Sequence, residues 1–398
     1  MRQAGWFIAL TLLQCGHAAV PAESEWRGEI ALEFRAFTES ALDPVQNDSN
    51  LSLSGEVEYY TSWDEGRQSF MIKPFGRLDQ RDYKRTHGDL REAVWIFSDD
   101  GLEVRAGVDK VFWGVTEVYH LVDIINQTDA VENRDGEQKL GQPMFKLSLE
   151  RDWGVLDLFY MPMFRERTFP SAEGRPRSQP RVAYEMTEFQ NHQEKYHQDL
   201  ALRWSQNLGD WDLGLAHFYG TGREPSYSLG HDNDGLPVLI PRYEIIHQSS
   251  IDLQGAVGDW LWKFEGIHRE GQGPSFFAAT GGFEYTFYGI VESSSDLGVL
   301  TEVMWDERGD SATTPFNRDV FLGLRWVAND VDGTEVLSGV VNDWENSTRF
   351  FNLEASRRLG NDWKLGLQAR FWSNVDEGDA LFGLRRDDYI EFKLSRFF

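Results

Sequence analysis

The chain has 398 residues, with 39 Lys and Arg against 65 Asp and Glu, and a formal net charge of −26. This acidic balance disfavours nucleic acid as a partner, because binding to phosphates depends on clustered positive charge. The single cysteine, Cys15, lies in an N-terminal segment expected to be removed. Disulfides, thiolate metal sites and cysteine nucleophiles are therefore excluded from the mature chain.

The N-terminus has the pattern of a secretory signal peptide over residues 1–22. Arg2 supplies the positive charge, an apolar core follows at residues 6–13, and Val20-Pro21-Ala22 is a suitable cleavage site. Beyond it, no apolar run approaches the roughly 18 residues that a membrane-spanning helix needs. Residues 23–398 are predicted to form a single domain.

Short segments in which apolar and polar residues alternate recur along the rest of the chain. In residues 29–38, for example, Ile30 and Leu32 share one face while Glu33 and Arg35 share the other. Alternation with a period of two predicts strands with two different faces. The predicted strands cover residues 29–38, 50–63, 68–79, 90–97, 102–111, 145–150, 155–164, 200–208, 211–220, 243–257, 260–269, 276–292, 297–307, 319–328, 335–342, 350–359, 364–372 and 386–398.

The connections between these strands alternate in length, with short turns on one side and longer loops on the other. This alternation, an even strand number and abundant aromatic residues are typical of a transmembrane antiparallel β-barrel of the outer membrane, with short periplasmic turns and long external loops. The count is about 18 strands. Pro74, which cannot donate to a ladder, and the ambiguous register of residues 243–257 leave 16 strands as the alternative.

Charged residues within the strands of such a barrel are expected to face the lumen, because Arg or Lys on the lipid face costs about 2–4 kcal/mol near the midplane. The predicted lumen-facing charges are Glu33, Arg35, Glu58, Arg91, Glu103, Arg105, Arg203, Glu302, Arg325, Glu354 and Arg370. Two interpretations are equally supported. These residues either form structural salt bridges that fill a narrow interior, or they line opposite walls and act on polar solutes.

Aromatic residues mark the predicted ends of the strands. The dipeptide Asp-Trp recurs at short turns, which predicts that Trp153, Trp211, Trp260 and Trp363 lie at one membrane interface. Phe398 ends the chain on the apolar face of the last strand. A terminal aromatic is characteristic of outer-membrane proteins, whose assembly machinery reads this terminus.

Residues 113–142 break the alternation. Five aliphatic residues lie within residues 118–125, and an acidic, glycine-containing run follows. The stretch is too long for an ordinary connection, and its apolar half argues against disorder. We therefore predict a constriction loop folded into the barrel. In this interpretation Trp113 and Gly114 turn the chain inward, Ile124 and Ile125 anchor it on the wall, and Glu117, Asp123, Asn126 and Asp129 face the passage.

The place of this loop, between the fifth and sixth predicted strands, resembles that of the third external loop of porins, which narrows their lumen. The local sequence is also similar to a family of uncharacterised Gram-negative outer-membrane proteins. That family has a Trp-Gly-x-x-Glu turn, an Ile-Asn-x-x-Asp element and a Pro-Met pair, here at residues 113–117, 125–129 and 143–144. The resemblance implies a porin-like barrel and is confined to this part of the chain.

Motifs of catalytic or metal chemistry are missing from the sequence. There is no Gly-x-Ser-x-Gly elbow, and His192 and His197 lack the His-Glu-x-x-His spacing of a zinc helix. Asp232-Asn233-Asp234-Gly235 lacks the length and distal Glu of a calcium loop. No catalytic residue, metal or cofactor is expected.

The sequence thus predicts an outer-membrane, porin-type channel for passive diffusion of small polar or charged solutes. Its expected partners are outer-membrane lipid, the solutes and the assembly machinery. The first alternative is a structural or envelope-assembly barrel with a closed plug, and the second is an outer-membrane enzyme. Neither the solute nor the oligomeric state follows from the sequence.

Overall fold

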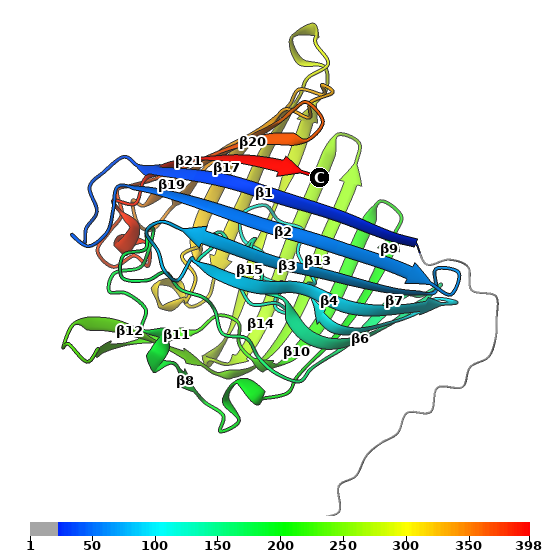
Figure 1. The fold of residues 1–398 in the computed structure, drawn as a ribbon, viewed down its shortest axis with the longest axis horizontal. Helices are drawn as coiled ribbons and strands as arrows, with labels where there is room; N and C mark the ends of the chain where they lie inside the picture. Colours follow the sequence, from blue (N-terminus) through cyan, green and yellow to red (C-terminus); the bar gives the residue numbers. More distant parts are fainter. Residues whose placement is uncertain (1–22) are drawn as a thin grey trace, which may run out of the picture.

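The computed structural model describes residues 23–398, so the predicted signal peptide lies outside the described residues. Eighteen antiparallel strands form one sheet, and β1 pairs with both β2 and β21, which closes the sheet into a barrel (Figure 1). The predicted 18-stranded antiparallel barrel is confirmed, and the alternative of 16 strands is wrong. The barrel strands are β1 (Glu23–Phe37), β2 (Ser49–Trp63), β3 (Gln68–Asp79), β4 (His87–Asp99), β5 (Leu102–Asp109), β6 (Gln142–Arg151), β7 (Gly154–Met161), β9 (Asp199–Leu208), β10 (Trp211–Thr221), β13 (Ile245–Val257), β14 (Trp260–Gly271), β15 (Gly273–Phe287), β16 (Asp296–Asp306), β17 (Arg318–Val327), β18 (Glu335–Asp343), β19 (Arg349–Leu359), β20 (Trp363–Ser373) and β21 (Tyr389–Phe397).

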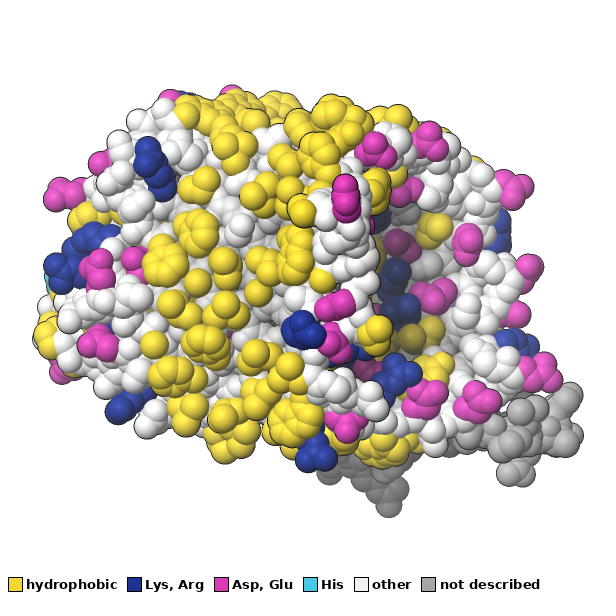
Figure 2. All heavy atoms as spheres, turned by 90° about the horizontal axis from the view of Figure 1, so that it is seen from above, with side chains coloured by type: hydrophobic (Ala, Val, Ile, Leu, Met, Phe, Trp, Pro, Cys, Tyr) yellow, Lys and Arg dark blue, Asp and Glu magenta, His cyan; other side chains and the backbone are white. Residues whose placement is uncertain are grey.

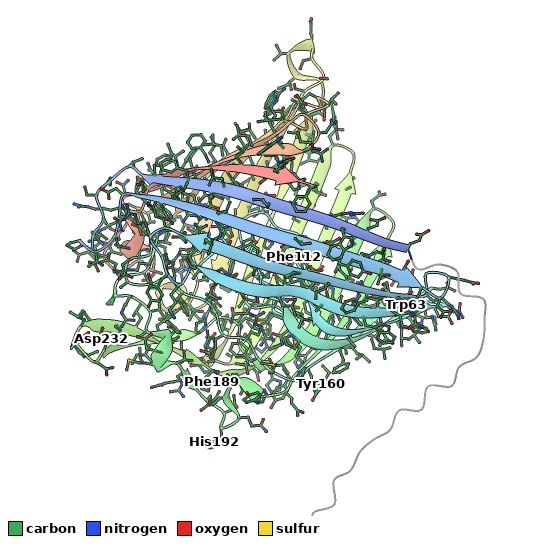
Figure 3. All side chains as sticks on the ribbon, in the orientation of Figure 1. Trp63, Phe112, Tyr160, Phe189, His192 and Asp232 are labelled. Carbon is green, nitrogen blue, oxygen red and sulfur yellow. The ribbon has the colours of Figure 1, made fainter. Side chains whose placement is uncertain are left out.

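A second, three-stranded sheet lies at the long-loop end of the barrel, at the lower left of Figure 1. It consists of β8 (Glu188–Phe189), β11 (Ser226–His231) and β12 (Pro237–Tyr243). Asp232 lies at the tip of its hairpin, and His192 lies at the periphery of the loops (Figure 3). The short 3-10 helices are Tyr184–Met186, Glu194–Tyr196, Ile290–Glu292, Gly309–Ser311 and Phe382–Leu384. In residues 23–398 no helix has the length and apolar character to cross a membrane.

The two ends of the barrel differ in loop length over most of the ring, although the short-side connections at residues 288–295 and 328–334 are longer than the long-side one at 344–348. The shortest connection on the long side joins β14 to β15. Between β14 and β15 the only residue outside the strands is Gln272, where the sequence had predicted a loop over residues 270–275. Gly271 and Gly273 have φ values of +100° and +77° there, a conformation that glycine adopts without strain. The expected interruption at Pro74 is a register shift between Lys73 and Pro74, and β3 continues through it.

The strands present apolar side chains outward and polar ones inward. On β1, Ile30, Leu32 and Phe34 are exposed on the outer wall, whereas Glu33 and Arg35 are buried inside. Figure 2 shows the result on one side of the barrel: apolar side chains cover the wall, and charged side chains gather towards the ends. Closure leaves no unpaired strand edge in the barrel.

The seam between the two chain ends involves Phe398. Its N–H donates to the carbonyl of Gly28 at 3.1 Å, and the Gly28 N–H donates to the carbonyl of Phe398 at 2.9 Å. A Cβ at Gly28 would lie only 2.3 Å from the Phe398 ring. The terminal aromatic therefore packs where a side chain at Gly28 would otherwise be.

The Asp-Trp dipeptides lie at the short-turn end. Trp153 is in the turn between β6 and β7, and Trp211, Trp260 and Trp363 are the first residues of β10, β14 and β20. Trp344 follows β18 at the opposite end. The four short-turn tryptophans thus share one end of the barrel, and their location at a lipid interface stays a prediction.

Candidate functional site: the lumen and its inward segment

Residues 113–142, hereafter the inward segment, pack against the inside of the barrel wall. Leu121, Val122, Ile124 and Ile125 are all buried. They form one cluster with wall residues of strands β6 to β15, namely Met144, Phe159, Met161, Ala201, Phe218, Ile246, Ile267, Phe276 and Ala278. Each fully buried aliphatic side chain contributes about 1.5–3 kcal/mol, so this contact is the main apolar attachment of the segment.

Two buried wall carboxylates hold the beginning of the inward segment through its backbone. Glu265 on β14 accepts hydrogen bonds from the N–H groups of Val115 at 2.7 Å, Thr116 at 3.0 Å and Val122 at 3.1 Å. Glu302 on β16 accepts those of Glu117 at 2.6 Å and Val118 at 3.1 Å. The segment has no regular structure that could satisfy these N–H groups, so charged acceptors on the wall replace a strand partner.

Trp113 and Gly114 lie where the chain leaves the wall after β5. The Trp113 ring meets Phe159 edge-on at 5.6 Å, and the Arg203 guanidinium lies 5.1 Å from the Trp113 ring centre. Gly114 has a φ of +145°, which a residue with a Cβ rarely adopts. Both residues are thus packed at the point where the backbone changes direction.

The polar residues that were expected to face the passage divide into two groups. Glu117 reaches the lumen and pairs with Arg325 at 2.6 Å. Asp123 pairs with Lys139 at 2.9 Å, and burial raises the pKa of Asp123. Asp129 is 0% exposed and does not line the lumen cavity, so the expectation that it faces the passage is wrong. Asn126 borders the cavity but is only 1% exposed. A carboxylate or amide in a constriction loop can form hydrogen bonds or ion pairs with other protein groups as readily as it can be exposed to solvent.

Asn126 and Asp129 instead hold the segment together. The Asn126 amide donates to the carbonyls of Asp109 and Leu140, both at 2.9 Å. Asp129 forms an ion pair with Arg91 at 2.7 Å. Burial would raise the pKa of Asp129, but His87 and Arg91 outweigh it and hold that pKa at about 2.

The charges predicted to face the lumen are engaged with other groups of the interior. Glu302 bonds the backbone as described, and the remaining ones form ion pairs. The pairs are Glu33 with Arg77 and Arg85, Arg35 with Glu391, Glu58 with Lys73, Arg91 with Asp89 and Asp129, Arg105 with Glu103 and Asp109, Arg203 with Asp252, Arg325 with Glu117 and Glu284, and Arg370 with Asp135 and Glu354.

One group of side chains has the composition of a metal site. His87, Asp129 and Glu132 bring ligand atoms within 4.8 Å of one another. Arg91 already pairs with Asp129 at 2.7 Å, and Arg77 pairs with Glu132 at 2.7 Å. These guanidinium groups supply the positive charge that a cation would bring, so the group is better described as an ion-pair network.

A second segment, residues 165–183, crosses the outer mouth of the barrel and is called the mouth segment here. Arg175 is buried and pairs with Asp387 at 2.7 Å and Asp48 at 3.0 Å. Its guanidinium also lies 4.1 Å from the ring centre of Phe37. In the sequence these residues fell in the connection between the predicted strands at 155–164 and 200–208. Its partners come from distant loops, so no local signal could have revealed the packing.

Between the two segments and the wall formed by β17 to β21 lies a cavity of about 1200 Å³. Phe321 and Arg325 of β17, Gln368 of β20 and Glu391 of β21 are among the wall residues that line it. At the end of the molecule where Trp63 lies in Figure 3, Figure 2 shows a hollow lined by basic and acidic side chains. The apolar part of the inward segment thus packs on the β6 to β15 side of the barrel. Its Glu117 and Asp135 reach Arg325 of β17 and Arg370 of β20, and the cavity lies beside these contacts.

Comparison with known proteins finds only distant structural likenesses. No family model and no curated protein matches the chain. Among solved structures, a triple mutant of the Rhodopseudomonas blastica porin is 12% identical with a TM-score of 0.44, and covers 94% of this chain and 100% of its own. A Vibrio cholerae OmpT lacking loop L8 is 10% identical with a TM-score of 0.45, and covers 95% of this chain and 99% of its own. Likenesses of this strength carry no functional argument, and the resemblance to the Trp-Gly-x-x-Glu family stays a prediction.

Proposed function

We propose that the chain is a channel of a Gram-negative outer membrane through which small polar or charged solutes diffuse passively. The observation that carries this proposal is the cavity of about 1200 Å³ inside a closed barrel with an apolar outer wall. A barrel of this width leaves an aqueous lumen unless something fills it, and here the inward segment, attached mainly to the β6 to β15 wall, leaves this cavity unfilled.

A closed structural barrel is the second candidate. It is favoured by the mouth segment, in which Arg175 and Arg177 are buried among ion pairs and carbonyl groups. An enzyme at the lumen mouth is a third and weaker candidate, since the sequence lacks catalytic motifs. Outer-membrane lipid and the barrel assembly machinery are the expected partners in the proposal.

Solute flux separates these candidates. Folded protein, recognised by its altered gel migration without boiling, is reconstituted into liposomes and into planar bilayers. A channel should let small sugars and KCl pass with a conductance that scales with salt concentration. Folded protein that conducts no ions and passes no solute would reject the channel and leave the closed barrel. Liposomes made with the boiled protein are the control for leakage.

A further inference from the structure

The wall of the cavity differs in charge from the chain as a whole. Ten Lys and Arg line it against eight Asp and Glu, whereas the chain has 39 against 65. The basic residues are Arg134, Lys139, Arg167, Arg177, Arg223, Arg269, Arg325, Lys364, Arg370 and Lys393, and the acidic ones are Glu117, Asp123, Asp135, Glu137, Glu224, Glu335, Glu354 and Glu391. The acidic excess of the protein therefore lies away from this surface.

Pairing makes the contrast stronger. Every acidic residue of this wall except Glu335 lies within 4.0 Å of an Arg, Lys or His side chain. Among the basic residues, Arg134, Arg167 and Lys364 form no ion pair within residues 23–398. A solute in the cavity thus meets one carboxylate without a cationic partner, that of Glu335, and three cations without an anionic one.

Two of these cations come from the two segments that narrow the lumen. Arg134 is an exposed residue in the second half of the inward segment. Its backbone N–H donates a hydrogen bond to the side-chain oxygen of Asn133. Arg167 belongs to the mouth segment and donates to the carbonyl of Arg223 at 3.0 Å and to Gln127 at 3.3 Å. A guanidinium has five N–H donors, so Arg167 keeps donors for a further acceptor.

Tyr227 of β11 lines the same cavity as both arginines. Burial raises the pKa of Tyr227, while the charges of Arg167 and Arg134 oppose that rise. The ring of Tyr227 stands edge-on to Phe169 at 6.4 Å. Phe169, Val182 and Leu239 add apolar surface to this part of the cavity. Two guanidinium groups and a phenol thus adjoin an apolar wall.

We propose that Arg134, Arg167 and Tyr227 form a binding site for the carboxylate of a small organic anion whose apolar body packs against Phe169, Val182 and Leu239. The inference rests on the proposed channel and specifies its solute class. Arginine suits a carboxylate because its planar fork can donate two parallel hydrogen bonds. Lys364 is the second residue of β20, at the short-turn end, and its charge attracts anions that enter there.

The test uses the mature full chain in planar bilayers. Arg134→Gln, Arg167→Gln and the double variant are compared with Arg386→Gln, which removes an exposed arginine of an external loop outside the cavity wall. In a tenfold KCl gradient, each cavity variant should shift the permeability ratio towards K⁺ by about threefold, because two unit charges about 7 Å apart in water interact by roughly RT. Arg386→Gln should not change it.

Benzoate serves as the organic anion and benzyl alcohol as its uncharged counterpart. Benzoate should reduce the KCl current of the wild-type channel and of Arg167→Lys, which keeps the charge, and should not reduce that of the double variant. Benzyl alcohol should act equally on all of them. An unchanged permeability ratio together with equal benzoate block in wild type and double variant would overturn the site.

Calorimetric titration of the folded protein in detergent with benzoate tests the site without a current. Binding by wild type that the double variant loses supports the site even for a barrel that conducts nothing, which is the outcome that rejects the channel. Absence of benzoate binding in a conducting wild type rejects the site and leaves the channel. The single Arg134→Gln variant, at an exposed position, keeps the titration interpretable where the double variant does not fold.

Discussion

Glu265→Gln is the most informative single change. Glu265 belongs to the barrel wall, is buried, and binds the inward segment without being part of it. Its Oε1 accepts from Val115, from Thr116 N–H and from the Thr116 hydroxyl at 2.8 Å, and its Oε2 accepts from Val122. Gln keeps one oxygen, removes the charge and places an NH₂ group opposite the N–H of Val122. The shape of the side chain is preserved, so the wall itself should stay intact.

The magnitude follows from the bonds that change. A hydrogen bond to a charged group contributes about 1.5–3 kcal/mol and a neutral one about 0.5–1.5 kcal/mol. Three weakened bonds and one lost bond therefore cost roughly 4 kcal/mol or more. The four buried aliphatic side chains of the segment contribute about 6–12 kcal/mol between them. The apolar attachment exceeds the loss, so residues 113–118 should loosen while Ile124 and Ile125 stay in place.

Single-channel recording and limited proteolysis measure this outcome. Glu265→Gln should give a noisier current with a modestly higher mean conductance, and earlier proteolytic cleavage in the inward segment of the folded barrel. Glu58→Gln is the matched control, since Glu58 pairs with Lys73 on the wall at 2.8 Å. A trace with the same mean and noise as wild type, together with unchanged resistance to protease, would refute the assignment of Glu265 as an anchor.

Three further changes test other parts of the molecule. Gly28→Ala should lower the yield of folded barrel on gels, because its Cβ would overlap the Phe398 ring, whereas Gly76→Ala, with no atom within 4 Å of the new Cβ, should not. Burial lowers the pKa of His120, but Glu137 and Glu265 raise it to about 10. The stabilisation by the His120 charge is therefore complete below pH 6.5 and is lost as the pH rises through 10, so current noise should increase over that range in wild type and not in His120→Gln. Replacing residues 171–178 by a Gly-Ser linker of equal length should raise conductance, and an unchanged value would show that this stretch does not limit the flow.

The barrel could be predicted because its governing signal is local. Each strand carries its own two-residue period, and a lipid-facing wall requires that period along every strand. The β14–β15 connection was missed for an equally local reason. Its Gly-Gln-Gly-Pro sequence, residues 271–274, is typical of a loop, but the positive φ values of the two glycines allow the strands to continue to within one residue of each other.

The interior was predictable only in part. An aliphatic side chain inside a barrel is favoured only where it packs against other apolar groups, so the burial of Ile124 and Ile125 could be predicted from their residue type. A carboxylate has two favourable environments, solvent or a guanidinium group. Which of them it occupies depends on residues distant in the sequence, as Arg91 is for Asp129. For the same reason the burial of the mouth segment could not be predicted, since the sequence of a buried arginine network does not differ from that of a solvated polar loop.

The hydrogen bonds between Gly28 and Phe398 have a consequence for how the protein is made. β1 closes the barrel by pairing with β21, so a polypeptide that lacks β21 lacks the closing partner of β1. Such a product presents the unpaired edge of β1, which is open to foreign strands and to proteases. The seam therefore distinguishes chains that contain β21 from those that lack it, and only the former can form the closed ring.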